Sequence, residues 1–100
     1  MFATTDGTTF RFVRLFVDAP ERSEEVVVPT SLEDAAVRAQ LFPSDHFLRR
    51  LAEGVADRER REGKPVATVR VEAWRIDFGG EPLKGTERRL RSFTLYVSPS

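Results

Sequence analysis

The segment from residue 45 to residue 62 constrains the fold more than any other, because its apolar residues recur at helical spacing. The apolar stripe consists of Phe47, Leu48, Leu51, Ala52 and Val55. Charged residues that can pair at i,i+4 occupy the opposite side, so the pattern predicts an amphipathic helix. Ser44 is a favourable N-cap, and Gly63 is a natural residue just past the C-terminal end. A helix with one apolar side must cover another apolar surface, which the rest of the chain has to supply.

Strands are predicted on both sides of this helical region. Residues 8–17 are dominated by aromatic and β-branched residues on both faces, which is typical of a central strand. A turn at residues 18–24, with a loop of about six residues, leads to a short strand at residues 25–29 and completes a first hairpin. Residues 66–78 and 88–97, joined by a Gly- and Pro-containing hairpin loop of about eight residues, are predicted to form a second antiparallel hairpin.

The apolar pattern of residues 66–78 changes phase in mid-strand. The apolar residues are Val69, Val71 and Ala73 in the first half and Trp74, Ile76 and Phe78 in the second. A single β-bulge near Ala73 would place both sets on one face. Alternatively, the strand is regular and its two faces are covered at different ends. We favour the bulge, because Arg75 and Asp77 then both point to solvent.

A shorter helix is predicted at residues 30–42, where Thr30 and Glu33 fit a capping box and Pro43 ends the helix. The element order is therefore strand, strand, helix, helix, strand, strand. This order predicts an α+β fold, ββααββ, in which two hairpins form a four-stranded antiparallel sheet and the long helix packs on one sheet face. We expect residues 1–100 to be a single domain, since this is a common domain size. The strand order is left open.

The composition argues against several classes of protein. Sixteen Lys and Arg residues balance sixteen Asp and Glu residues, so the chain lacks the net positive charge of a dedicated nucleic-acid binder. The sequence has no Cys, which excludes disulfides and thiolate metal sites. No apolar run approaches the roughly 20 residues of a membrane span, and the first residues lack the pattern of a signal peptide. We expect a cytoplasmic protein if the chain is complete, whereas an excised domain could come from any compartment.

The sequence contains no pattern that indicates catalysis. The only histidine, His46, follows Asp45 directly, and adjacent helical residues do not face each other. The letters DFGG and GGEPLKG lack the context of a kinase magnesium motif or of a phosphate-binding loop. We therefore expect a protein that is not an enzyme and that has no cofactor and no metal site.

Arginines and the single tryptophan form the candidate interaction surface. It consists of Trp74, Arg75, Arg88, Arg89 and Arg91. Trp and Arg are enriched in protein interfaces. The interpretation that we favour is simpler: Trp74 and the Phe residues belong to the core, and arginines beside an edge strand protect it against aggregation. An anion or RNA surface, with Phe12 or Trp74 stacking on bases, is the other interpretation. Interleaved Glu59, Glu62 and Glu87 make nucleic acid the less favoured partner.

Several pieces of the sequence resemble one known family. The run from MFATTDGTTF through VPTSLEDAAVRAQLFPSDHFLRRLAEGV to VRVEAWRIDF resembles the soluble tail of some bacterial multi-pass membrane proteins. These proteins have a vitamin-K-carboxylase-like, horizontally transferred transmembrane (HTTM) domain. The resemblance rests on the early Met-Phe, the LFP before the long helix and the VEAW-type strand after it. It implies an accessory domain that has no catalytic residue of its own.

These observations predict a small non-catalytic domain that acts by binding or assembly. We expect an unknown protein partner or a second copy to contact an open sheet face or edge, and a homodimer would bury the surplus apolar surface. One alternative is binding of RNA or single-stranded nucleic acid through the Arg clusters and aromatic residues. The other is a small apolar-ligand carrier, with the ligand between helix and sheet, or an enzyme accessory domain.

Overall fold

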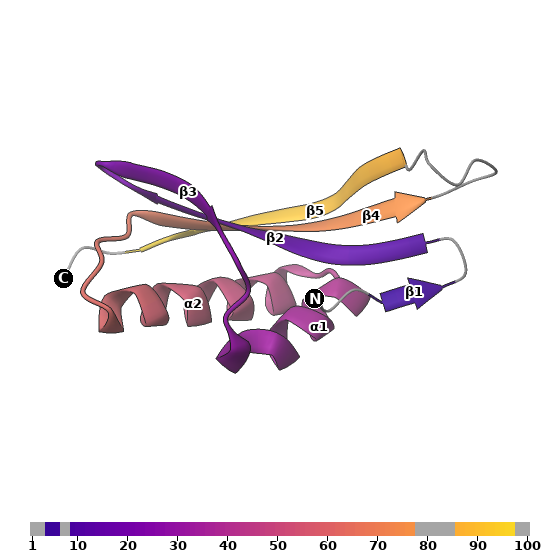
Figure 1. Ribbon diagram of the computed structural model, residues 1–100, viewed down its shortest axis with the longest axis horizontal. Coiled ribbons are helices and arrows are strands. Elements are labelled where there is room, and N and C mark those ends of the chain that lie inside the picture. The colour runs from indigo at the N-terminus through magenta and orange to yellow at the C-terminus, as the bar shows by residue number, and fades with distance from the viewer. Residues whose placement is uncertain (1–3, 7–8, 78–85, 98–100) are drawn as a thin grey trace.

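The computed structural model describes residues 4–6, 9–77 and 86–97. Its elements, in chain order, are β1 (Thr4–Asp6), β2 (Thr9–Ala19), β3 (Arg22–Val26), the 3-10 turn η1 (Thr30–Leu32), α1 (Glu33–Leu41), α2 (Asp45–Arg61), β4 (Thr68–Asp77) and β5 (Thr86–Tyr96). The strands form one antiparallel sheet, and α1 and α2 lie together on one face of it (Figure 1). The predicted α+β class with two helices between two hairpins is therefore confirmed. Among the described helices, none is both long enough and apolar enough to cross a membrane.

Strand β2 is central in the sheet. It pairs with β4 from Thr9 opposite Asp77 to Asp18 opposite Thr68. Its other side pairs with β3 near its C-terminal end and with β1 near its N-terminal end. Strand β5 pairs with the free side of β4, which gives the order β1/β3, β2, β4, β5. The short strand β1 has no counterpart in the sequence-based prediction.

The first hairpin is tighter than the sequence predicted. Strand β2 continues to Ala19, and β3 begins at Arg22, so the turn contains only Pro20 and Glu21. Residues 27–29, which were assigned to the second strand, lie outside the sheet. The register is supported by a hydrogen bond from the Ser23 hydroxyl to the Asp18 carboxylate, which joins the two strands beside the turn.

The predicted capping box of the first helix is wrong. Residues Thr30–Leu32 form a 3-10 turn, α1 begins only at Glu33, and within this described segment neither element has a side-chain N-cap hydrogen bond. The preceding turn allows Leu32 to pack closely against α2 at Gly54, where an added methyl carbon would lie 2.6 Å from Leu32 Cδ2. Close packing of this side chain accounts for the irregular start of α1.

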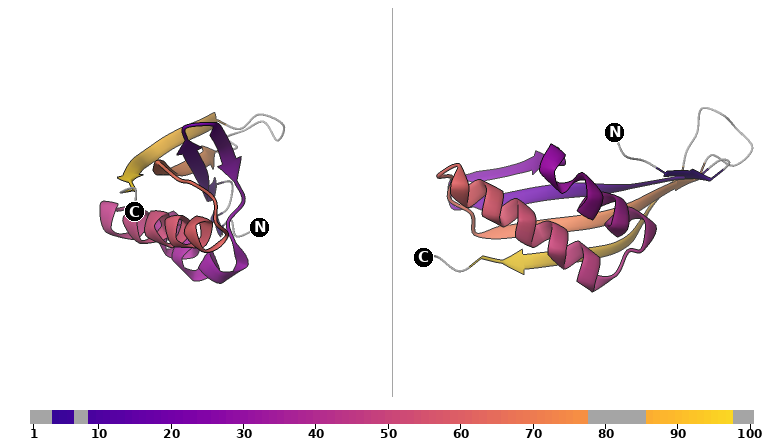
Figure 2. Two further views of the ribbon diagram at one scale, coloured as in Figure 1. Left: turned by 90° about the vertical axis from the view of Figure 1, so that its left-hand side faces the viewer. Right: turned by 90° about the horizontal axis from the view of Figure 1, so that it is seen from below.

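Helix α2 agrees with its prediction at both ends. The Ser44 hydroxyl accepts a hydrogen bond from the Phe47 backbone N–H at 3.4 Å. Gly63 follows the helix with a positive φ of 73°, a conformation that glycine adopts without strain. The apolar stripe packs on the sheet, and Figure 2 shows α2 lying along the sheet from two further directions. The buried core consists of Leu15, Val17, Ala36, Ala39, Leu48, Leu51, Ala52, Val55, Ala56, Val69, Val71 and Ala73.

The favoured bulge in the strand at residues 66–78 is also wrong. The strand is regular, as the alternative interpretation had it, but the helices cover only one of its faces. The β2–β4 ladder runs without any register shift, so β4 is regular. The irregularity at this level lies on β5. Ala73 pairs with Arg91 and the next residue, Trp74, pairs with Arg89, so Leu90 of β5 is an additional residue without a partner on β4. The two apolar sets of β4 therefore occupy opposite faces. Phe78 and the loop predicted at residues 79–85 lie outside the described residues.

Candidate interaction surface

The helix side of β2 and β4 changes from apolar to polar residues at the same level of the sheet, whereas Phe16 of β2 already lies on the open face. Beside the helices, the apolar residues are Val13, Leu15 and Val17 on β2 and Val69, Val71 and Ala73 on β4. Successive residues of a strand point to opposite faces. Further along the sheet, the face away from the helices therefore carries four apolar side chains, Phe10 and Phe12 on β2 and Trp74 and Ile76 on β4. The change falls between two directly paired positions, Val13 opposite Ala73 and Phe12 opposite Trp74. Two segments far apart in the sequence thus encode the same change.

The second set forms a compact group, which we call the apolar block. Its members are Phe10, Phe12, Trp74 and Ile76, in which Phe10 pairs with Ile76 and Phe12 with Trp74. The Phe12 and Trp74 rings are stacked, with their centroids 6.4 Å apart and an interplanar angle of 14°. All four side chains are partly exposed. The sheet continues past the corner between α1 and α2, and both helices lie on its other face (Figure 1).

Arginines and aromatic rings alternate on the same open face, next to the apolar block. The Arg14 guanidinium carbon lies 5.3 Å from the Phe16 ring centroid and 5.7 Å from that of Trp74. Arg70 lies 4.4 Å from the Phe16 centroid. Arg14 also forms an ion pair of 2.7 Å with Glu25 on β3. Hydrogen bonding to Glu25 raises the pKa of Arg14 and lowers the pKa of the Glu25 carboxyl. These contacts hold the aromatic rings and the arginines in fixed positions.

Glu72 is buried in the open face, with a relative exposure of 5%. Its Oε1 accepts a hydrogen bond of 2.9 Å from the Trp74 indole N–H. Its Oε2 lies 3.1 Å from Arg70 Nε and 3.6 Å from Arg89 Nη1. The sequence analysis did not identify this carboxylate. The available signal was its position between Arg70 and Trp74 on the same side of a predicted strand.

The predicted surface is divided between the two faces of the sheet. Trp74 and Arg89 lie on the open face. By the strand register, the other three residues lie on the helix side, namely Arg75, Arg88 and Arg91. Arg91 Nε donates a hydrogen bond of 2.8 Å to Asp45 at the start of α2, which lowers the pKa of the Asp45 carboxyl. Sequence proximity grouped these residues, but the sheet does not bring all five together.

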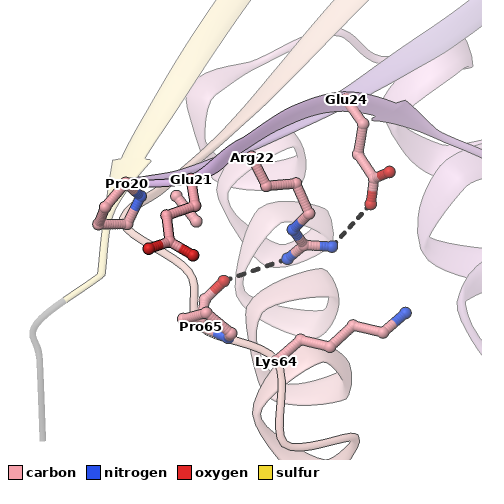
Figure 3. Close-up of a pocket in the computed structure, with 7 residues that line it drawn as sticks. Pro20, Glu21, Arg22, Glu24, Lys64 and Pro65 are labelled. Atoms are coloured by element: carbon pink, nitrogen blue, oxygen red, sulfur yellow. Dashed lines mark hydrogen bonds and ion pairs between the residues drawn. The ribbon is translucent and has the colours of Figure 1, made fainter.

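A surface hollow of about 730 Å³ lies at the β2–β3 turn (Figure 3). Arg22 extends across it, with Nη1 2.6 Å from Glu24 and Nη2 donating to the Pro65 carbonyl oxygen at 3.1 Å. Arg22 Nη2 is also 3.7 Å from Glu59, a buried carboxylate with 6% exposure. The sequence analysis named Glu59 only among the interleaved acidic residues, although its position four residues after Val55 continues the apolar stripe. The charged groups in this hollow mainly hold the turn against the end of α2.

The described residues do not form a metal centre. Within residues 4–6, 9–77 and 86–97, no group of three His, Cys, Asp or Glu side chains is arranged to hold a metal ion. His46 is exposed, and its ring contacts the Phe47 ring edge-on with a centroid distance of 5.2 Å. The candidate site considered further is the open face, with its stacked rings of Phe12 and Trp74 and its buried Glu72.

The acid stability of the fold should depend on Asp18. Hydrogen bonds from Ser23 first and from Thr68 second lower the pKa of this carboxyl below its ordinary value of 3.8. The unfolded chain therefore binds the proton more readily, and the stabilisation present above about pH 4 is lost as the pH falls through the lower folded-state pKa. In urea unfolding between about pH 2 and 6, Asp18→Asn and Ser23→Ala should both weaken the acid dependence. Identical acid dependence in wild type and both variants would contradict this assignment.

Comparison with protein-family models, with curated proteins and with solved structures finds no match to this chain.

Proposed function

We propose that the chain is a non-catalytic binding module that assembles through the apolar block, and that its partner is a second copy of itself. The coordinated change of faces on β2 and β4 carries this proposal, because it directs Phe12 and Trp74 away from the helices. Burial of a large apolar side chain contributes roughly 1.5–3 kcal/mol, so a block of such residues on an open face favours association. This role agrees with the accessory domain that the family resemblance implies, and it does not depend on that resemblance.

The charges of the open face favour a second copy over a polyanion. Its basic residues are Arg14, Arg70 and Arg89, and its acidic residues are Asp18, Glu25, Glu72 and Glu87. Each of these arginines lies within ion-pair distance of a carboxylate, at 2.7 Å for Arg14, 3.1 Å for Arg70 and 3.6 Å for Arg89. A face with both signs interspersed can meet its own copy about a two-fold axis so that opposite charges are juxtaposed.

Light scattering after size exclusion should show a dimer whose fraction rises with protein concentration. Trp74 is the only tryptophan in the chain, so its fluorescence reports directly on the apolar block. Dimer formation buries the indole, and dilution should therefore shift its emission to longer wavelength as the dimer dissociates. The two measurements should give the same midpoint concentration.

The variant Phe12→Glu should weaken the dimer at least tenfold, because each copy would then bury a carboxylate without a partner. Its side chain is on the open face of the monomer, so the fold should persist by circular dichroism. Phe42→Glu is the matched control, since Phe42 is 62% exposed but lies at the corner between α1 and α2. A wild-type chain that stays monomeric at the highest concentration, or equal effects of the two variants, would refute the proposal.

Single-stranded nucleic acid is the second candidate partner. The stacked pair of Phe12 and Trp74 on an open sheet face, with Arg89 opposite Trp74, has the chemistry of a platform for bases. This function predicts that a fluorescent oligonucleotide binds with an affinity that falls steeply with added salt. Binding that Phe12→Glu abolishes, together with a monomeric wild type, would favour this candidate over the dimer.

A further inference from the structure

A row of three arginines crosses the helix side of the sheet, behind the apolar block. Arg75 on β4 pairs with Arg11 on β2 on one side and with Arg88 on β5 on the other. Neighbouring strands are about 4.8 Å apart, so the three residues span roughly 10 Å. Like charges that lie directly opposite in a sheet destabilise it. The row therefore concentrates positive charge on this part of the sheet.

The described residues compensate this row only in part. Arg75 Nε donates a hydrogen bond of 2.8 Å to Asp77 Oδ1, the same oxygen that accepts from the Thr9 hydroxyl at 2.9 Å. Arg11 Nη1 donates to the Leu41 carbonyl oxygen at 3.5 Å, at the C-terminal end of α1. Among the described residues, no carboxylate lies within ion-pair distance of Arg88. Among the described residues, Arg75 with Asp77 is the one ion pair within the row, whereas each arginine of the open face has a carboxylate beside it.

Neighbouring acidic groups do not remove this excess of positive charge. Two other acidic residues lie near this end of the helix side. Asp45 is engaged with Arg91 at 2.8 Å. Asp6 on β1 pairs with Thr9, two residues along β2 from Arg11. Arg75 retains 37% exposure of its side chain, and Arg88 is exposed. The positive charge is therefore local and accessible, even though the whole chain has a formal net charge of zero.

We propose that Arg11, Arg75 and Arg88 form a binding site for anions of the phosphate class. The planar guanidinium fork matches two oxygens of a phosphate group, and adjacent arginines can bind the same group from two sides. Two linked phosphate groups can occupy both gaps in the row, so a diphosphate binds more tightly than a monophosphate. The anion can be free in solution or part of a lipid headgroup, and in both cases it neutralises the repulsion across the three strands.

Isothermal titration calorimetry with inorganic pyrophosphate and inorganic phosphate tests the free anion, and sedimentation with vesicles containing phosphatidic acid tests the lipid. We expect Arg75→Gln and Arg88→Gln each to weaken binding at least tenfold. Arg49→Gln is the matched control, because Arg49 lies on the exposed side of α2 in an ion pair with Glu53. Binding of soluble pyrophosphate identifies a free anion, and binding confined to vesicles identifies a headgroup.

Thermal unfolding gives a second, independent measurement. Without added anion, Arg75→Gln should melt at or above the temperature of the wild type, because it relieves repulsion within the row. Pyrophosphate should raise the melting temperature of the wild type and of Arg49→Gln, but not that of the row variants. The proposal is overturned if the wild type binds none of the three probes, or if Arg75→Gln and Arg88→Gln bind as well as Arg49→Gln. Neither result tests the proposed dimer, because the apolar block lies on the opposite face of the sheet from the arginine row.

Discussion

Replacing Leu51 with alanine should lower the free energy of unfolding by about 2–5 kcal/mol. Leu51 is 0% exposed and lies in the middle of the stripe by which α2 packs on the sheet. The substitution removes apolar contacts and leaves a cavity that the close-packed interior fills only in part. A domain of this size has a total stability of about 5–15 kcal/mol, so the loss should be large in a urea titration followed by circular dichroism and Trp74 fluorescence.

Leu90→Ala is the matched control for this prediction. Leu90 is 37% exposed and is the additional residue in the β4–β5 ladder, so the same chemical change should alter stability by less than about 0.5 kcal/mol. Comparable losses in the two variants would mean that α2 does not pack on the sheet as described.

The α2 packing was predictable because its sequence signals agree with one another. The apolar stripe, the Ser44 N-cap and the C-terminal Gly63 all indicate the same helix. When local signals agree in this way, a helix can be predicted from its own sequence alone. The capping box at Thr30 shows the limit of local signals. There no side-chain cap forms and Leu32 packs against Gly54, a contact that only the folded chain brings about.

The change of faces in β4 was visible in the sequence, but its meaning was not. A shift from Ala73 to Trp74 in an apolar pattern fits either a bulge or two faces covered at different ends. The register against β2 decides between them, because Phe12 shows the same change directly opposite Trp74. Strand pairing depends on contacts between distant segments, so this information is absent from either segment alone.

The placement of the predicted arginines on two different faces of the sheet also depends on strand pairing. Arg89 and Arg91 have the same parity along β5 and would share a face in a regular strand. The additional residue Leu90 places Arg89 opposite Trp74 and Arg91 opposite Ala73, on different faces of the sheet. The positions of Glu59 in the helix stripe and of Glu72 between Arg70 and Trp74 were only weak signals of burial, because burial of a carboxylate depends on which cation the fold places beside it.

Replacing Glu72 with alanine should lower the free energy of unfolding by about 1–3 kcal/mol. The change leaves the Trp74 indole N–H without its acceptor and separates Arg70 and Arg89 from their shared carboxylate. The side chains of these two arginines are 41% and 56% exposed, so solvent screens the released charges. The loss should therefore stay below the roughly 3–5 kcal/mol of a fully buried pair.

Glu72→Gln and Glu53→Ala complete this test. The glutamine retains an acceptor for Trp74 but removes the charge, so its loss should be intermediate, and Trp74 emission should change less than in the alanine variant. Glu53→Ala breaks an ion pair on the exposed side of α2, 3.5 Å from Arg49, where the expected loss is only about 0.3–0.5 kcal/mol. Urea titrations of the three variants measure these differences. If Glu72→Ala lowers the free energy of unfolding no more than Glu53→Ala does, then Glu72 does not hold Arg70, Arg89 and Trp74 in place on the open face. The open face would then not be a rigid surface for a partner.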